Sequence, residues 1–279
     1  MDDYSNNKDR KGMKGLSFFF LEKGAGLIDG RQIGEFLGAK LNPTDGFEDD
    51  ICIYVKCQPP ENFPEYSYIN IVDGVGLIPW IKSHPQIGVI VTSITAKKYL
   101  SEILNKSDVK FIPEHHCNYE RFKRSKKEIN TVGVIGNQKG FDYDIQETSK
   151  QFREIGFEFK YCGNYKNRFD VINFYQTIDI QINWRPHVTG AHAKLHNPLK
   201  LANAASFGIP TVSYTEENYV EEFGGYFVEA EEIDEIFLRT KMLQDFPLIY
   251  ETYSDLLLKK SEEYHIENVA NLYRGLTEV

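Results

Sequence analysis

Short apolar runs alternate with longer amphipathic stretches through the first half of the chain. In two of the longer stretches apolar residues recur three and four positions apart, which predicts helices over about 29–41 and 95–104. The short runs are rich in aromatic and β-branched residues and end at glycine, proline or aspartate, as strands do. We expect strands over 16–21, 51–56, 68–72, 88–92 and 109–112.

The second half repeats this alternation. Apolar runs predict strands over 131–135, 157–161, 178–182 and 209–214. Helical periodicity predicts helices over about 143–155, 171–177 and 198–207, and a final helix over about 247–276 with a break near His265. Strands that alternate with helices predict an α/β protein with parallel, doubly wound sheets. A length of 279 residues suffices for one large domain of this kind or for two small ones.

The stretch 179–214 is the most informative, because it reads as strand, polar loop, helix and strand. Asn197 is a good N-cap for the helix, and Pro198 suits its first position, where a missing N–H costs nothing. The free N–H groups and the dipole of a helix N-terminus favour a phosphate, and Lys200 adds a positive charge beside it. A capped surface helix without a ligand is the alternative interpretation.

Polar residues also follow the ends of two strands, where ligands bind in open α/β sheets. Trp184 offers an indole that can stack on a base or sugar, and Arg185 and His196 can neutralise phosphate oxygens. Gly136 and Asn137 form part of a glycine loop whose backbone N–H groups can approach a diphosphate. A plain tight turn is the alternative for that loop.

Two runs, 197–204 and 207–212, resemble the donor-binding segment of glycosyltransferases with the GT-B fold. This resemblance implies two Rossmann-like domains that face each other across a cleft, with terminal helices that pack back across the first domain. It implies an N-terminal acceptor domain over 1–118 and a C-terminal donor domain over 119–279. It also implies a nucleotide-sugar donor as co-substrate, a glycan or glycoconjugate acceptor, no cofactor and no obligatory metal.

The sequence departs from the family pattern at one pair of positions. Many retaining members carry two glutamates with seven residues between them, and the second usually holds the ribose hydroxyls. Here Asn203 stands at the second position and Leu195 at the first. An asparagine can hydrogen-bond a hydroxyl, but less strongly than a carboxylate does. Glu216 and Glu217, after the next strand, could supply that carboxylate, and a solvated acidic loop is the alternative.

Inverting transfer needs a general base within hydrogen-bond reach of the acceptor hydroxyl, whereas retaining transfer needs none. The candidates are Asp73, Glu22 and His115, at the ends of first-domain strands and at the crossing between the domains. Asp73 is the first choice because it ends a buried strand and precedes glycines that leave room for a substrate; an Asp-Gly turn is the alternative. The resemblance also places Gly24 and Gly26 in an acceptor-side loop near the transferred sugar.

Composition narrows the compartment and the partners. A net charge of −9 argues against nonspecific nucleic-acid binding, which needs clustered lysine and arginine. The exception is the basic run 121–127, which reads as a solvated linker or as a contact for an anionic lipid surface or a phosphorylated acceptor. The four cysteines are scattered and lack the spacing of a metal site, and the sequence shows no apolar leader and no membrane-spanning run. These features predict a cytoplasmic protein that is at most peripheral to a membrane.

Three functions remain open from the sequence. The leading hypothesis is a glycosyltransferase that moves a sugar from a nucleotide-diphosphate donor to a hydroxyl of a cell-surface glycan or glycoconjugate. A noncatalytic nucleotide- or sugar-binding protein on the same scaffold is the alternative, because the glutamate pair is missing. A nicotinamide-dependent oxidoreductase is the weakest hypothesis, because the third glycine of the dinucleotide-binding motif does not fall at the required spacing.

Overall fold

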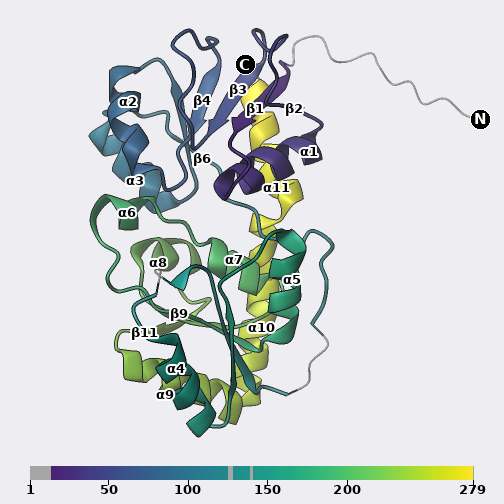
Figure 1. Cartoon of the computed structure of the whole chain (residues 1–279), viewed down its shortest axis with the longest axis vertical. Helices are drawn as coiled ribbons and strands as arrows, with labels where there is room; N and C mark the ends of the chain where they lie inside the picture. The colour runs from purple at the N-terminus through teal and green to yellow at the C-terminus, as the bar shows by residue number, and fades with distance from the viewer. Residues whose placement is uncertain (1–13, 125–127, 139–140, 279) are drawn as a thin grey trace, which may run out of the picture.

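The computed structural model describes residues 14–124, 128–138 and 141–278. These residues form two lobes along the long axis of the molecule, each built on a parallel sheet with helices packed against it (Figure 1). The chain passes from the first lobe to the second after residue 111, and the C-terminal helices return to the first lobe (Figure 1). The predicted α/β class, with two Rossmann-like domains and parallel sheets, is confirmed.

The first lobe holds a six-stranded sheet in the order β2-β1-β3-β4-β5-β6, with every neighbouring pair parallel. β3 is buried at every position, as expected for a strand covered on both faces. All five predicted strands form, and the short edge strand β2 is additional to them. The strands are β1 (Leu16–Phe20), β2 (Lys40–Leu41), β3 (Ile51–Val55), β4 (Ser67–Asn70), β5 (Gly88–Val91) and β6 (Lys110–Phe111).

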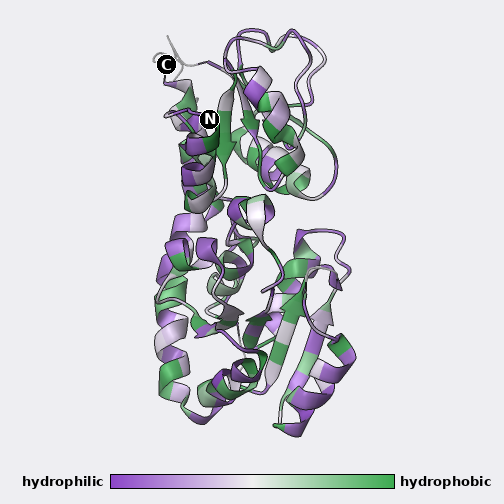
Figure 2. Ribbon diagram, turned by 90° about the vertical axis from the view of Figure 1, so that its left-hand side faces the viewer, coloured by the Kyte–Doolittle hydropathy of each residue, from purple (hydrophilic) through white to green (hydrophobic). Residues whose placement is uncertain are grey.

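The second lobe holds a five-stranded sheet in the order β11-β10-β9-β7-β8, again parallel throughout. Its four predicted strands are present, and apolar residues mark the strands of both lobes (Figure 2). The edge strand β11 has three residues, too few for a periodic pattern to show in the sequence. The strands are β7 (Thr131–Ile135), β8 (Glu158–Cys162), β9 (Ile180–Asn183), β10 (Thr211–Tyr214) and β11 (Val228–Ala230).

Local sequence signals explain several helix starts. Ser93 accepts the N–H of Ala96 and caps α3, and Asn167 with Asp170 forms a capping box at α5. The helices and helical turns are η1 (Gly26–Gln32), α1 (Ile33–Leu37), η2 (Val75–Leu77), α2 (Ile78–Ser83), α3 (Ile94–Ile103), α4 (Ile145–Glu154), α5 (Arg168–Thr177), α6 (Gly190–Leu195), α7 (Leu199–Ala205), α8 (Glu217–Phe223), α9 (Ile233–Asp245), α10 (Pro247–Ser261), η4 (Glu262–Tyr264), α11 (Ile266–Arg274) and η5 (Gly275–Thr277). Within the described ranges, none of them has the length and apolarity to cross a membrane.

Two of these helices stand where the sequence reads as loop. α6 replaces part of the polar loop before α7, and it buries a single residue, Leu195. α8 replaces the acidic loop after β10 and buries Tyr219 and Phe223 against the second-lobe core. Glu216, at the N-cap, and Glu222 are buried, whereas Glu217 and Glu221 are exposed. The segment is therefore a packed helix with an exposed acidic face rather than a solvated loop.

The C-terminal helices tie the two lobes together. α10 packs against α7 in the second lobe, α11 packs against α1 in the first, and the chain turns between them at His265, the predicted break. Val269 and Tyr273 of α11 are fully buried in the first-lobe core. The Tyr273 hydroxyl accepts a hydrogen bond of 3.1 Å from Asn70 Nδ2 at the end of β4. The first lobe is therefore complete only with residues from the far end of the chain.

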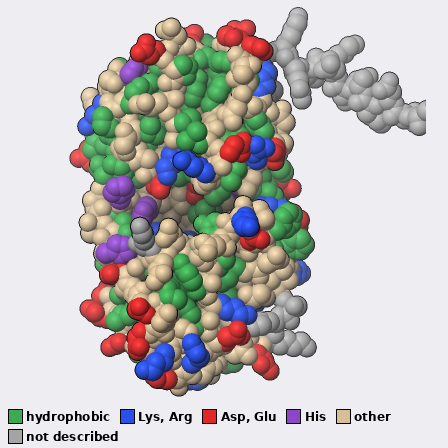
Figure 3. Space-filling model, in the orientation of Figure 1, with side chains coloured by type: hydrophobic (Ala, Val, Ile, Leu, Met, Phe, Trp, Pro, Cys, Tyr) green, Lys and Arg blue, Asp and Glu red, His purple; other side chains and the backbone are tan. Residues whose placement is uncertain are grey.

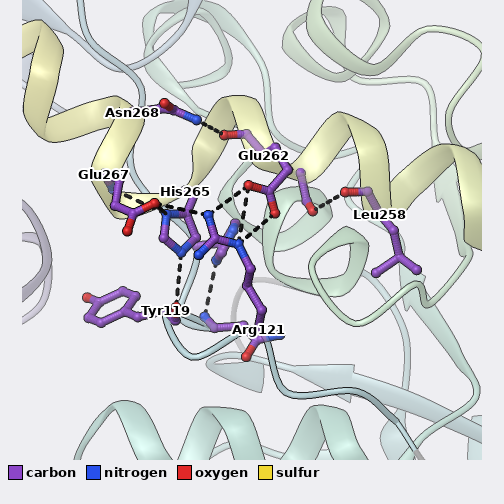
Figure 4. Close-up of polar contacts among 10 residues, drawn as sticks. Tyr119, Arg121, Leu258, Glu262, His265, Glu267 and Asn268 are labelled. Carbon is purple, nitrogen blue, oxygen red and sulfur yellow. Dashed lines mark hydrogen bonds and ion pairs between the residues drawn. The ribbon is translucent and has the colours of Figure 1, made fainter.

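The turn at His265 is fastened to the segment that joins the lobes. Arg121 Nη2 lies 2.9 Å from Glu262 Oε2 and 3.0 Å from Glu267 Oε2, and a His265 ring nitrogen lies 3.0 Å from the Tyr119 carbonyl oxygen (Figure 4). Arg124 also pairs internally, with buried Asp179. Arg121 and Arg124 of the basic run thus form ion pairs within the protein. Residues 125–127 of the run lie outside the described part of the chain.

Candidate active site

A cavity of about 490 Å³ opens between the two lobes, and the surface is hollowed at this level (Figure 3). Its walls include residues that follow β1, β3 and β4 on one side and β7 and β9 on the other. Strand order reverses at β1/β3 in the first sheet and at β7/β9 in the second. Because ligands bind outside the carboxyl ends of strands at such switch points, the cavity faces two ligand-binding edges at once.

Most of the predicted site residues meet in this cavity, although they come from segments far apart in the sequence. The predicted residues that line it are Gly24, Asp73, His115, Gly136, Arg185, His196, Asn197, Lys200 and Asn203.

Lys200, on the first turn of α7, points its ammonium into the cavity beside Gly136. Nζ lies 4.4 Å from the centre of the Phe141 ring, and a Cβ atom at Gly136 would lie only 3.3 Å from it. Gly136 also has a φ of +123°, a conformation that favours glycine. Within the described ranges, no carboxylate lies within ion-pair distance of Lys200. Burial and the charge of Arg185 lower the pKa of Lys200 to about 7.

Arg185, just beyond β9, is held rigidly at the cavity wall. Its Nε and Nη2 atoms contact the two oxygens of Glu216 at 2.8 and 2.6 Å, and Nη2 donates to the Tyr219 hydroxyl at 2.8 Å. His196 Nδ1 lies 3.7 Å from the same carboxylate. Burial alone would raise the pKa of Glu216, but His196 and Arg185 hold it below its ordinary value. Glu216 is therefore the counter-ion of Arg185, and both of its carboxylate oxygens contact Arg185 rather than being directed at a ribose.

Asn197 joins the start of α7 to the first lobe. Its Oδ1 accepts the Leu199 N–H at 3.1 Å, and its Nδ2 donates to Glu114 Oε2 at 2.6 Å. Pro198 occupies the N-cap position, one residue later than predicted, because its ψ of 26° keeps it outside the helix. Since the first helical N–H is bonded to Asn197, the charge offered to an anion here comes chiefly from Lys200.

Asn203 lies one turn further along α7 and contacts the interdomain segment, the chain between β6 and β7, of which residues 112–124 and 128–130 are described. Its Oδ1 accepts the backbone N–H of Cys117 at 2.7 Å. Its Nδ2 has no hydrogen-bond partner among the described residues and lines the cavity with the rest of the side chain. Because Oδ1 is bonded to Cys117, only the Nδ2 amide group of Asn203 could make the predicted contact with a substrate hydroxyl.

Two buried carboxyl groups of the first lobe were not among the predicted residues. Glu114 lines the cavity just beyond β6, and Asp29 of η1 is fully buried next to it. Tyr165, half exposed at the cavity rim, was also outside the prediction. Little in the sequence marks any of them, because an aspartate within an amphipathic helix and a tyrosine in a polar loop usually face solvent.

Asp73, the first choice for a base, reaches the cavity after β4 and pairs with Lys56. Both side chains are 43% exposed, so the pair is solvated. The Gly74 N–H bonds the Ile71 carbonyl oxygen at 2.8 Å, which is the tight turn of the alternative interpretation. The turn and the cavity position therefore coexist.

His115 is buried in the cavity wall with both ring nitrogens near backbone carbonyl oxygens. Nε2 lies 3.1 Å from the Ile28 oxygen and Nδ1 lies 3.2 Å from the His116 oxygen. Burial lowers the pKa of His115 to about 4. A neutral imidazole bound in this way is a structural link between η1 and the interdomain segment, and its geometry does not suit a general base.

Several predicted site residues lie away from the cavity. Trp184 is buried in the second-lobe core, edge-to-face with Tyr214 at 5.5 Å, so its indole is not available to stack on a ligand. Glu22 is exposed and pairs with Arg31, and Glu217 pairs with Lys194 at the surface. Two further predicted residues are outside the lining: Gly26 packs so closely on the Leu21 carbonyl that a Cβ atom would overlap it, and Asn137 is exposed.

Comparison with known proteins identifies the fold. No family profile matches this sequence. The chain is 24% identical over 177 residues to a protein of Haemophilus influenzae described as an uncharacterized glycosyltransferase, and the match covers 55% of this chain and 50% of that protein. The chain thus spans about half the length of this curated relative.

Solved structures of GT-B glycosyltransferases resemble most of this chain. Sucrose-phosphate synthase from Thermosynechococcus elongatus has a TM-score of 0.60 at 10% identity, covering 94% of this chain and 99% of that one. HepE from Anabaena, in complex with UDP and glucose, has a TM-score of 0.54 at 11% identity, covering 96% and 100%. The pneumococcal O-GlcNAc transferase GtfA, in complex with UDP and GlcNAc, has 0.51 at 10% identity, covering 83% and 53%. The fold of this chain is GT-B.

Proposed function

We propose that this protein is a glycosyltransferase that takes a sugar from a nucleotide-diphosphate donor and passes it to a hydroxyl of a glycan or glycoconjugate. The observation that carries this proposal is Lys200, a buried ammonium without a carboxylate partner in the described structure, placed at the switch point of the second sheet. The GT-B fold and the relationship to a described glycosyltransferase support it.

The donor diphosphate would lie against Lys200, Gly136 and Arg185. Lys200 supplies a charge that has no other partner, and Arg185 is fixed by Glu216, so its remaining N–H groups hold one direction. Gly136 leaves room for the phosphates because it has no side chain to fill the space beside Lys200. Fixed cations at a leaving diphosphate stabilise the charge that develops as the bond to the sugar breaks. Because two side chains supply that charge, we propose transfer without an obligatory metal.

The nucleoside would lie toward Tyr165. This side chain is 49% exposed at the cavity rim, in the loop between β8 and α5, and an aromatic face there can stack on a base. It takes the part that the sequence assigned to Trp184. The sugar would then extend from the diphosphate toward the first lobe, where the acceptor enters.

Thermal stabilisation by nucleotides tests this proposal. UDP, UDP-glucose and UDP-GlcNAc come first in the panel, because two of the similar structures hold UDP with a sugar; GDP, CDP, ADP and TDP forms follow. We expect a shift selective for one nucleoside diphosphate, since a ligand that binds only the folded state raises its stability. Lys200→Ala should abolish the shift. Lys241→Ala, at an α9 lysine paired with Asp245, is the control and should keep it. No shift with any nucleotide would overturn the proposal.

Turnover separates the transferase from a noncatalytic binding protein on the same scaffold. Release of the nucleoside diphosphate from the stabilising nucleotide-sugar, with or without EDTA, would support metal-independent transfer. Stabilisation without any release, tested with a panel of glycan acceptors, would favour the binding protein.

A further inference from the structure

The first lobe places two carboxyl groups together at the edge of the cavity. Glu114 is 5% exposed and lines the cavity, and Asp29 is fully buried and interacts directly with it. Glu114 Oε2 accepts one hydrogen bond, from Asn197 Nδ2 at 2.6 Å. Neither oxygen of Asp29 has a hydrogen-bond donor among the described residues.

Two neighbouring buried carboxyl groups that form no ion pair cannot both remain ionised at neutral pH, and Lys56, whose charge acts on Glu114, pairs instead with Asp73. Within the described ranges, no lysine, arginine or histidine forms an ion pair with either group. Burying a charge is unfavourable, so at least one of the two carboxyl groups stays protonated. Burial raises the pKa of Asp29 well above its ordinary value, and it raises the pKa of Glu114 to about 7 against the opposing hydrogen bonds from Asp29 and Asn197.

These directions divide the roles of the two groups. Asp29, the more deeply buried, keeps its proton and donates it in a hydrogen bond to Glu114. Glu114 titrates near neutral pH and faces the cavity. The ionisable groups around Glu114 are Asp29 from η1, Lys56 after β3, Asp73 after β4, Tyr165 before α5 and Tyr273 of α11.

We propose that Glu114 is the general base of the transfer and that Asp29 is a positioning residue behind it. This inference rests on the proposed function. The acceptor hydroxyl oxygen forms a bond to the anomeric carbon while the bond from that carbon to the diphosphate oxygen breaks. The hydroxyl proton passes to the Glu114 carboxylate, and the bonding electrons leave with the nucleoside diphosphate. Such a direct displacement inverts the configuration at the anomeric carbon.

Glu114 suits this role better than Asp73. A base is most effective when its pKa lies near the working pH, and the pKa of Glu114 is about 7, whereas the Asp73 carboxylate is already paired with Lys56. Glu114 also belongs to the segment beyond β6, which Asn197 joins to the start of α7 and so to Lys200. The base and the diphosphate site are therefore held by one connected structure.

The decisive experiment compares Glu114→Gln with Asp73→Asn, using the nucleotide-sugar that stabilises the protein and water or a glycan as acceptor. Glutamine keeps the size of the side chain and an oxygen for Asn197 but cannot take a proton. We expect kcat for Glu114→Gln to fall about 10²–10⁴-fold with nucleotide binding retained. Asp73→Asn should lower kcat by less than about tenfold. A normal kcat in Glu114→Gln, or a change confined to KM, would overturn the inference.

Asp29 is tested by the pH profile. Activity of the wild-type protein should rise with pH as Glu114 loses its proton, with a midpoint near the pKa of about 7. Asp29→Leu removes the hydrogen bond that stabilises the Glu114 carboxylate, so the midpoint should move to higher pH. Asp29→Asn, which can still donate, should restore it. An unchanged midpoint in Asp29→Leu would show that Asp29 has only a packing role and would refute its assignment.

The stereochemistry of the product gives an independent check by NMR. Inversion would support Glu114 as base, and retention would overturn it. If nucleotides bind but no donor is ever turned over, the base assignment fails while the donor site stands. If no nucleotide binds, the proposed function fails first.

Discussion

Asn203 Oδ1 accepts the backbone N–H of Cys117 at 2.7 Å, and this bond links α7 of the second lobe to the segment that joins the lobes. The resemblance to GT-B glycosyltransferases matches this position to a glutamate that, in many retaining members, usually holds the ribose hydroxyls. Here the side chain is 9% exposed and its oxygen is already engaged by the protein. The departure from the family pattern therefore has a structural consequence, because the residue contacts the segment that joins the lobes and also lines the cavity.

Asn203→Ala should destabilise the protein by about 1–3 kcal/mol, because the Cys117 N–H would stay buried without an acceptor. Urea unfolding followed by fluorescence measures this change. Asn203→Asp is the matched variant, since its carboxylate can still accept from Cys117, and it should lose less. Equal loss in both variants would show that the bond to Cys117 does not account for the effect.

Donor affinity should depend on pH through Lys200. Its pKa of about 7 in the free protein means that the ammonium is fully charged only below that pH, and a bound diphosphate favours the charged form. The dissociation constant of the nucleotide-sugar should therefore rise above pH 7, approaching about tenfold per pH unit. Isothermal titration between pH 6 and 9 measures it. Lys200→Arg keeps its charge, so binding by this variant should be nearly independent of pH over the same range.

Lys200→Met should stabilise the free protein while abolishing nucleotide binding. The lowered pKa shows that the folded state disfavours the ammonium, so its cost to stability is present below pH 7 and fades as pH rises toward the unfolded pKa. At pH 6 we expect a gain of about 1 kcal/mol or more, roughly 2–4 °C in Tm for each kcal/mol. Calorimetry at pH 6 and pH 9 should show the larger gain at pH 6. A loss of Tm at pH 6 would contradict this view.

Glu216→Gln should be strongly destabilising, by about 3–5 kcal/mol, because it leaves Arg185 buried without its counter-ion. Chemical denaturation measures the loss. Glu217→Gln is a control one residue away, since Glu217 pairs with Lys194 at the surface and should change stability by less than about 1 kcal/mol. Saturating nucleotide should recover part of the Glu216→Gln loss, because the diphosphate can neutralise Arg185. Similar effects from the two variants would refute the role of Glu216 as a buried counter-ion.

The strands and most helices could be predicted because their apolar patterns are long enough to be read. α6 and β11 were missed because each is short, with too few buried residues to form a pattern. Lys200, Arg185 and Gly136 line the cavity, and the sequence could place them there because they stand at strand ends and at a helix start, where the ligand crevice of an open α/β sheet lies. These positions follow from chain order alone.

Other parts of the site depend on contacts between distant segments. Asp29 and Glu114 are far apart in the sequence, and only the packing of η1 on the interdomain segment brings them together. Trp184 was predicted wrongly although a signal existed. It continues the two-residue alternation of Ile180 and Ile182 onto the core side of β9, as their shared hydrophobic cluster shows.

The packing of α11 in the first lobe also matters during synthesis. Residues 16–111 supply all six strands of the first sheet, yet Val269 and Tyr273, which bury themselves against that sheet, are translated much later. During translation the apolar surface of the first lobe that α11 covers stays exposed until α11 has been synthesised. The first lobe therefore cannot complete its core while the second lobe is being made. A chain that terminates before residue 266 should therefore bind chaperones or aggregate, even though it contains every strand of both sheets.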